Sequence, residues 1–246
     1  MPRIRLDQAL VQKALCPSRE QAKRLILAGE VSVDGHPSTK PGTLIAVDAK
    51  LHVRTPPKYV SRGGLKLEGA LDHFGIDVNG KTCLDIGSST GGFTDCLLQR
   101  GAARVYAFDV GTNQLAWKLR NDPRVVSREN FNVRHMTAAD VSAPVDLLVG
   151  DLSFISLTLV LPAATSTVRP GGDCVMLVKP QFELSRDEVG KGGIVRDPAL
   201  HQKACDKIRD YVERDPQLRW KGITESSIQG TDGNREFLAW FSVVDG

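Results

Sequence analysis

The sequence lacks any run of about 18 consecutive apolar residues, the length that a membrane-spanning helix needs. Its first residues, MPRIRLDQAL, contain no apolar core of the length that a secretory signal requires. The five cysteines include no Cys-x-x-Cys pair, and the five histidines form no closely spaced pair. We therefore expect a cytoplasmic protein that does not bind membranes and that has neither a disulfide framework nor a metal site.

Two common nucleotide-binding patterns are also missing. The G-x-G-x-x-G spacing of dinucleotide-binding folds does not occur, which argues against NAD as a cofactor. The segment Gly190-Lys191-Gly192-Gly193 has no Ser or Thr after its lysine and no G-x-x-x-x-G-K frame, so it is not a phosphate-binding loop. We interpret this segment as a mobile lid over a substrate site, with a plain surface loop as the alternative.

Basic residues are concentrated at the start of the chain. Residues 1–58 contain ten Lys/Arg and five Asp/Glu, whereas residues 59–246 contain 22 and 24. The net charge is therefore +5 in the first part and −2 in the second. This asymmetry is typical of a nucleic-acid-binding module attached to a nearly neutral enzyme.

The first 55 residues predict a small α+β domain. Leu6, Leu10 and Ala14 recur at helical spacing before Pro17, and a second helix begins after Ser18, whose capping-box partner is Gln21. Short strands follow around the hairpin signal at residues 34–35 and at residues 44–47 and 51–53. Paired prolines then indicate a linker at residues 56–59.

This outline, with RLDQALV and SREQAKRLILAGEVSVDG, resembles the small RNA-binding domain first seen in ribosomal protein S-four. In its second helix Ala22, Leu25 and Ile26 should face the core, while three basic residues share another face and can meet phosphates. The candidate RNA-binding residues are Arg3, Arg5, Arg19, Lys23, Arg24 and Arg62.

Residues 60–246 predict a larger α/β domain, because apolar strand patterns alternate there with helical ones. The expected arrangement is a Rossmann-like, mostly parallel sheet flanked by helices, with an antiparallel last strand. We expect strands at Thr82–Ile86, Arg104–Phe108, Val145–Val149 and Cys174–Val178, helices near Leu159–Thr167 and His201–Val212, and a final antiparallel pair at Trp220–Ile228 and Glu236–Val244.

A glycine-rich turn marks the candidate cofactor site. In CLDIGSSTGGFTD, Asp85 is followed by Gly87 and Gly91 where a strand turns into a helix, so the backbone can approach a ligand closely. The segment resembles the first motif of class I methyltransferases, which accommodates the methionine end of S-adenosylmethionine. Asp109 ends the next expected strand, where a carboxylate can bind both ribose hydroxyls. The candidate cofactor-binding residues are Asp85, Gly87, Ser88, Gly91, Gly92, Phe93, Asp109, Asn132 and Asp151.

Asp140 has two interpretations that the sequence leaves open. It precedes the strand expected at residues 145–149, so it can lie near the adenine of the cofactor. It can equally be a solvated loop acid.

Four charged residues, Lys66, Asp151, Lys179 and Glu236, are not needed for packing in this fold. Asp151 and Lys179 follow two expected strands, at the edge where open α/β sheets bind their ligands. Methyl transfer to a ribose hydroxyl requires removal of a weakly acidic proton, and a lysine with an ordinary pKa of about 10.4 is protonated at neutral pH. A second lysine nearby and partial burial both favour the neutral amine. We assign Lys179 as the base and Asp151 as its orienting partner, with Lys66 and Glu236 positioning the ribose.

The blocks KYVSRGGLKLEGAL, LDIGSSTGGFTD, DLSFISLTLVLP, LVKPQFE, VGKGGIVRDPALH and GNREFL resemble the TlyA family over essentially the whole chain. Members of this family are known both as hemolysins and as ribosomal RNA 2′-O-methyltransferases. The second domain is similar to FtsJ-type methyltransferases, whose Lys-Asp-Lys-Glu tetrad matches residues 66, 151, 179 and 236. The resemblance implies S-adenosylmethionine as cofactor and a cytidine ribose of ribosomal RNA, at the ribosomal subunit interface, as substrate.

Three details qualify the resemblance. Ile86 and Ser88 replace the Val and Ala common in the family, changes that should preserve the turn. The chain ends soon after its last expected strand, as in the shorter family subtype, which modifies only the large ribosomal subunit; longer members modify both subunits. We expect a monomer whose partner is ribosomal RNA or a ribosomal subunit. The competing interpretations are a membrane-active hemolysin and a non-catalytic RNA-binding assembly factor.

Overall fold

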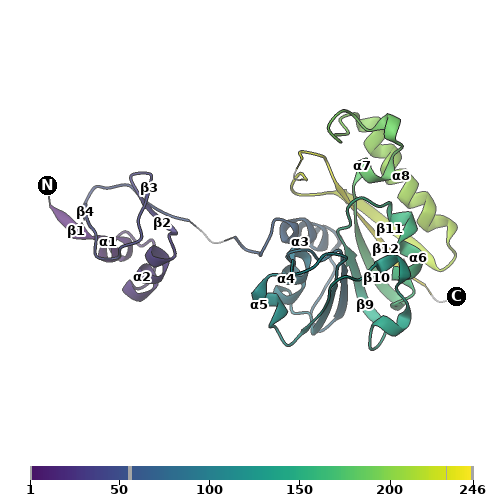
Figure 1. Cartoon of the computed structure of the whole chain (residues 1–246), viewed down its shortest axis with the longest axis horizontal. Helices are drawn as coiled ribbons and strands as arrows, with labels where there is room; N and C mark the ends of the chain where they lie inside the picture. The colour runs from purple at the N-terminus through teal and green to yellow at the C-terminus, as the bar shows by residue number, and fades with distance from the viewer. Residues whose placement is uncertain (1, 55–56, 231, 245–246) are drawn as a thin grey trace. The chain divides into compact units, whose positions relative to one another are not determined.

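The structure is a computed structural model that describes residues 2–54, 57–230 and 232–244. It divides into two compact units, Met1–Lys58 and Tyr59–Gly246 (Figure 1). The predicted linker includes Pro56, which lies outside the described residues, as does Thr55. No helix in the described ranges is both long enough and apolar enough to span a membrane.

The N-terminal unit consists of two helices and two small antiparallel sheets. The helices are α1 (Leu6–Gln12) and α2 (Arg19–Leu27). Strands β1 (Arg3–Arg5) and β4 (Leu44–Ala46) form one sheet, and β3 (His36–Pro37), β2 (Val31–Val33) and β5 (Leu51–Val53) form the other. Its core is made mainly of Leu6, Ala9, Leu10, Ala22, Ile26, Val31 and Ile45.

Local signals explain most of this unit. Ser18 Oγ accepts a hydrogen bond from the Gln21 amide, which is the Ser18 arm of the predicted capping box. The predicted hairpin at residues 34–35 joins β2 to β3. One helix prediction was too long: α1 ends at Gln12, and Ala14 has a left-handed φ of 55°. Strand β1 was not predicted, because three residues are too few to establish an alternating pattern.

A seven-stranded sheet forms the centre of the second unit, in the order β11-β12-β10-β9-β6-β7-β8. The pairs among β8, β7, β6, β9 and β10 are parallel, and β12 is antiparallel to both of its neighbours. This confirms the predicted Rossmann-like fold with an antiparallel last strand. The strands are β6 (Thr82–Ile86), β7 (Arg104–Phe108), β8 (Val125–Arg128), β9 (Val145–Gly150), β10 (Val168–Val178), β11 (Leu218–Glu225) and β12 (Phe237–Val243).

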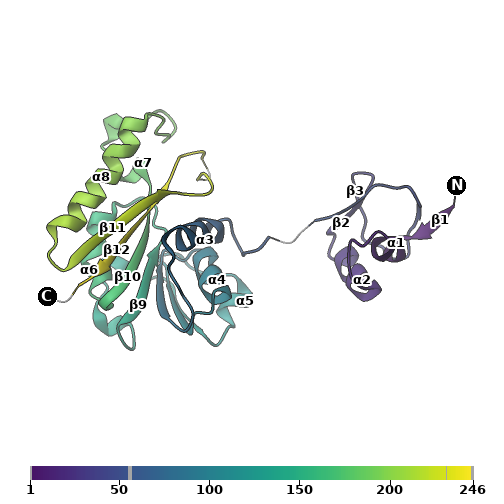
Figure 2. The ribbon, with the colours of Figure 1, turned by 180° about the vertical axis from the view of Figure 1, so that it is seen from behind.

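Helices cover both faces of this sheet (Figures 1 and 2). Side chains of α3, α4 and α5 pack with Leu147, Val149 and Leu177 on one face. Side chains of α6 and α8 pack with Leu148 and Met176 on the other, as the alternation of strand side chains requires. The helices are α3 (Gly63–Phe74), α4 (Gly92–Gln99), α5 (Trp117–Arg120), α6 (Leu161–Thr165), α7 (Pro180–Glu183) and α8 (Pro198–Arg214).

Two predicted boundaries in this unit were wrong. The helix expected over Leu159–Thr167 is a 3-10 turn at Leu157–Leu159 followed by the short α6. Strand β10 begins at Val168 rather than at the predicted Cys174, because the chain continues through an irregularity in strand pairing between Val168 and Asp173. The Pro-Gly-Gly sequence within this stretch favours a turn when considered alone.

The strand order also determines where a ligand can bind. From β6 the chain continues outward through β7 and β8, whereas its other neighbour, β9, begins the half of the sheet that contains β10, β12 and β11. Open α/β sheets bind ligands outside the carboxyl ends of the strands at such a reversal. The residues that follow β6 and β9 are therefore the first place to look for a site.

Candidate active site

A cleft of about 800 Å³ lies at this edge of the sheet. Its lining includes part of the glycine turn after β6, Ser153 and Phe154 after β9, and Gly192 and Gly193 from the glycine-rich loop. All four predicted catalytic residues also line it: Lys66, Asp151, Lys179 and Glu236. The structure thus brings together residues that are far apart in the sequence.

The four charged side chains form a continuous chain of alternating charge. Glu236 Oε2 lies 2.5 Å from Lys66 Nζ, and the same Nζ lies 4.0 Å from Asp151 Oδ2. Asp151 Oδ1 lies 2.6 Å from Lys179 Nζ. Asp151 therefore lies between the two amines, and a shift of its carboxylate would affect both.

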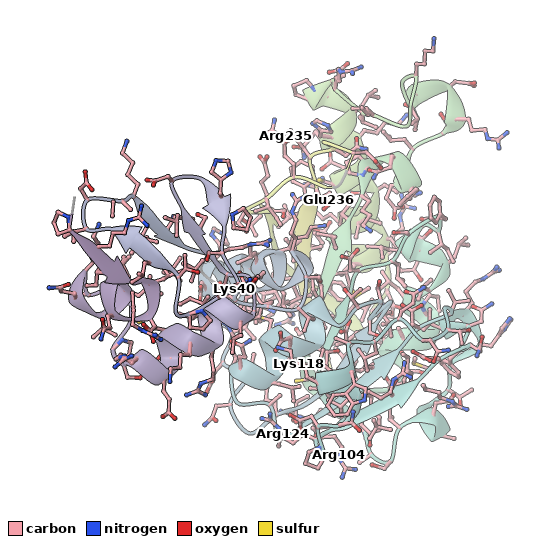
Figure 3. The ribbon with its side chains drawn as sticks, turned by 60° about the vertical axis from the view of Figure 1, so that its left-hand side comes forward. Lys40, Arg104, Lys118, Arg124, Arg235 and Glu236 are labelled. Carbon is pink, nitrogen blue, oxygen red and sulfur yellow. The ribbon has the colours of Figure 1, made fainter. Side chains whose placement is uncertain are left out.

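Each member of this chain comes from a different element. Asp151 follows β9 and Lys179 follows β10 directly, as predicted. Lys66 is on α3, and Glu236 lies one residue before β12 rather than inside the strand (labelled in Figure 3). Ser153, which was not predicted, accepts a hydrogen bond of 2.8 Å from Lys179 Nζ. Its position two residues after Asp151, at the same strand end, is the signal that could have identified it.

Close backbone approaches at the glycine turn position two of these four residues. A Cβ atom on Gly87 would lie 2.6 Å from the carbonyl oxygen of Asp151, and one on Gly92 would lie 2.9 Å from the amide of Gly64, which begins α3 with Gly63. Both separations are shorter than van der Waals contact allows. Glycine at these positions lets the Asp151 segment and the Lys66 helix lie against the turn.

The two predicted cofactor carboxylates lie beside this turn. Asp109 accepts hydrogen bonds from the amides of Ser89 (2.8 Å) and Gly111 (2.6 Å), which fix its orientation. Asp85 is fully buried, and its Oδ2 accepts a hydrogen bond of 2.6 Å from Thr94. Its Oδ1 is buried with no hydrogen-bond partner among the described residues. Burial raises the pKa of Asp85 to about 7, and the neighbouring carboxylates of Asp151 and Asp109 add to this effect.

Two further predicted or suspected cofactor residues do not line the cleft. Asn132 is exposed, and its side chain accepts a hydrogen bond from the amide of Arg134 at the start of a 3-10 turn. Asp140 caps its own 3-10 turn through Thr137 and forms an ion pair with Arg128. These contacts favour the interpretation of Asp140 as a loop acid.

Two aromatic side chains at the cleft were not predicted. Phe154 is 90% exposed and has a φ of 65°, which is unusual for a bulky residue. Its ring centroid lies 5.1 Å from that of Phe182 on α7, and both residues line the cleft. The sequence gives no signal for this pair, because the exposure of Phe154 depends on tertiary structure.

The glycine-rich loop is held to the segment before β12. Gly192 and Gly193 both have positive φ and line the cleft. Buried Asn234 donates to the carbonyl of Gly193 and accepts from the amide of Val195, both at 2.9 Å. The loop therefore borders the site, and its movement as a lid remains a prediction.

The predicted RNA-binding residues differ in how firmly they are held. Arg5 donates two hydrogen bonds of 3.0 Å to Asp7, and Arg19 donates one of 3.1 Å to the same carboxylate. Asp7 is fully buried, and the Arg5 guanidinium holds the pKa of Asp7 down at about 2. The remaining N-terminal candidates, Arg3, Lys23 and Arg24, are exposed.

Arg62 is the one predicted RNA-binding residue in the second unit. It lies next to the first residue of α3 and lines the cleft. Its guanidinium donates a hydrogen bond of 2.9 Å to the carbonyl of Gln229. This contact places a positive charge at the border of the cleft.

Comparison with protein families agrees with this division of the chain. Residues 59–243 match the FtsJ-like methyltransferase family, and residues 4–50 match the S4 domain. A solved structure from Streptococcus thermophilus that carries the hemolysin name is 45% identical, with a TM-score of 0.74. That match covers 100% of this chain and 90% of that one.

Two curated relatives span nearly the whole chain. The 16S/23S rRNA (cytidine-2′-O)-methyltransferase TlyA of Mycobacterium tuberculosis is 48% identical over 97% of this chain and 89% of that protein. Hemolysin A of Brachyspira hyodysenteriae is 44% identical over 98% of this chain and 100% of that protein. The chain therefore belongs to the FtsJ-like methyltransferase family and, within it, to the TlyA proteins.

Proposed function

We propose that this protein transfers a methyl group from S-adenosylmethionine to the 2′-hydroxyl of a cytidine in ribosomal RNA, in the cytoplasm. The observation that carries the proposal is the placement of Asp151 between the amines of Lys66 and Lys179, in a cleft that also contains the glycine turn. The name of the M. tuberculosis relative supports cytidine ribose as the target.

The residues beside the turn fit S-adenosylmethionine. Asp85 Oδ1 is a buried acceptor with no partner among the described residues, which suits a ligand that carries an ammonium group. Asp109 is held by two amides and can accept the ribose hydroxyls of a nucleoside. The backbone of Gly87 and Gly91 leaves the turn free of side chains. When bound, the cofactor supplies an electrophilic methyl group.

The four charged residues can then act on the acceptor ribose. Lys179 Nζ accepts the proton of the 2′-hydroxyl, and Asp151 and Ser153 hold the amine in place. Lys66, held by Glu236, can donate hydrogen bonds to the ribose. General base catalysis typically supplies a factor of about 10² to 10⁴, so alignment of the reacting atoms must supply much of the remainder.

The surroundings of the cleft suit RNA. Phe154 and Phe182 offer an aromatic surface on which a base can stack, and such stacking is worth about 1–3 kcal/mol per base. Arg62 lies at the border of the same cleft. The basic N-terminal unit can add phosphate contacts through Arg3, Arg5, Arg19, Lys23 and Arg24.

Mapping ribose methylation tests the proposal. The 2′-O-methyl positions of both ribosomal RNAs would be compared between cells with the gene, cells without it, and cells that carry the Lys179→Ala variant. We expect one or more cytidine methylations that require the gene and its lysine. The map also tests the prediction that only the large subunit is modified. Identical maps in all three strains would reject the methyltransferase proposal and favour an assembly factor.

A further inference from the structure

We infer that Glu183 is a positioning residue for methyl transfer, which fixes the distance between Asp151 and Lys179 without touching the substrate. This inference rests on the proposed function. Glu183 is the last residue of α7, the short helix that begins directly after Lys179. It lies outside the lining of the cleft.

The carboxylate of Glu183 connects three segments. Its Oε1 accepts a hydrogen bond of 2.8 Å from the amide of Leu157, and its Oε2 accepts one of 2.5 Å from Ser156 Oγ. Lys207 on α8 lies 3.0 Å from Oε2 and also donates to the Glu183 carbonyl at 2.7 Å. Both oxygens therefore have partners on other elements.

These contacts end a series that joins the segments after β9 and β10. Asp151 and Ser153 both contact Lys179, Phe154 packs on Phe182, and Ser156 and Leu157 bond to Glu183. The series thus pairs residues 151–157 with residues 179–183 in order along both segments. The Glu183 contacts set the relative position of the two segments, and the Asp151–Lys179 pair depends on that position.

Burial argues that this carboxylate has a specific role. The Glu183 side chain is 1% exposed, and removing a carboxylate from water costs several kcal/mol unless its partners are complete. An apolar side chain would fill the same place without that cost. The directional bonds to Ser156 and Leu157 are what an apolar residue could not provide.

The test compares Glu183→Gln with Glu188→Gln in full-length protein, using ribosomal subunits that lack the modification. Glu188 is a suitable control because it pairs with Lys203, one turn earlier on α8, and shows no contact with residues 151–157. We expect Glu183→Gln to lower kcat about tenfold, since a displacement of 1 Å can cost about 10²-fold. The KM for the subunit and the Kd for S-adenosylmethionine should stay within about twofold, and Glu188→Gln should match the wild type.

The double variant Glu183→Gln, Lys207→Met separates positioning from stability. Removing both charges should return thermal stability toward the wild-type value, because no buried charge then lacks its partner. A low kcat in that stable double variant supports positioning, whereas a kcat that recovers with stability overturns it. Ser156→Ala decides the matter if Glu183→Gln does not fold: a lower kcat supports the inference, and an unchanged kcat rejects it. Absence of methylation by the wild type would instead reject the proposed function itself.

Discussion

Each of the two units places one aspartate between two basic side chains, but the basic residues differ. In the N-terminal unit Asp7 holds Arg5 and Arg19, and in the second unit Asp151 lies between Lys66 and Lys179. Asp7 is fully buried, whereas the Asp151 side chain is 23% exposed in the cleft. The two arginines are about half exposed, and the two lysines are 10% exposed.

The difference matches two kinds of chemistry. An arginine keeps its proton at any physiological pH, so a pair of arginines fixed on a buried acid is a permanent positive surface that suits phosphates. A lysine can lose its proton when it is desolvated, so a buried lysine can serve as a base. The same arrangement of one acid and two cations can therefore serve binding in one unit and proton transfer in the other.

Replacing Lys179 should give the largest effect, because the comparison depends on lysine's ability to lose a proton. Lys179→Ala should reduce methyl transfer by at least about 10²-fold to 10⁴-fold while leaving RNA binding nearly unchanged. Lys179→Arg keeps the charge but cannot act as a base, so it should be equally inactive. Single-turnover methylation assays measure both effects, and substantial activity in either variant would remove Lys179 as the base.

Neutralising Arg19, Lys23 and Arg24 together should give an intermediate effect. We expect RNA affinity to fall about tenfold or more and the slope of log affinity against log salt to decrease by about 2–3. A matched control neutralises Lys203, Arg209 and Arg214 on α8, three partly exposed or exposed cations of the second unit. Binding titrations at several salt concentrations would contradict the RNA-binding assignment if both triple variants behaved alike.

The smallest effect concerns pH and stability, and it contrasts two buried aspartates. The folded-state pKa of Asp85 is raised to about 7, so its stabilising contribution is complete below about pH 4 and is lost as pH rises to 7. The pKa of Asp7 is lowered to about 2, so its contribution is constant above pH 4 and is lost only at lower pH. Relative to the wild type, cofactor-free Asp85→Asn should therefore gain at least about 1 kcal/mol between pH 5 and pH 8.

Chemical denaturation at the two pH values measures this difference. Asp7→Asn serves as the control, because its stability relative to the wild type should be lower by a similar amount at both pH values. A difference for Asp85→Asn that does not change with pH would show that the Asp85 carboxylate does not titrate in this range.

The parts of the fold that the sequence predicted well are those in which local pattern and burial agree. Strands β6 and β7 have the predicted bounds, because every residue of each after the first is buried and a glycine-rich segment follows. Short elements such as β8 and α5 were not predicted, since four residues cannot establish a period. The start of β10 was missed because the Pro-Gly-Gly sequence looks like a turn until the neighbouring strand pairs with it.

The site shows the same limit. Asp151 and Lys179 could be predicted because the ends of parallel strands meet at one edge of the sheet. The partners of buried charges could not, since they depend on contacts between distant segments. Asp7 is held by Arg19 as well as by its near neighbour Arg5, and Glu183 is held by Ser156 and Lys207.

The contact between Gly87 and the Asp151 carbonyl restricts how this enzyme can evolve. Any side chain at position 87 would displace the residue that orients the base, even if the cofactor still fitted. Recognition of the methyl donor and deprotonation of the acceptor are thus inherited together. A descendant that adopted another cofactor by altering this turn would lose the ribose chemistry in the same step.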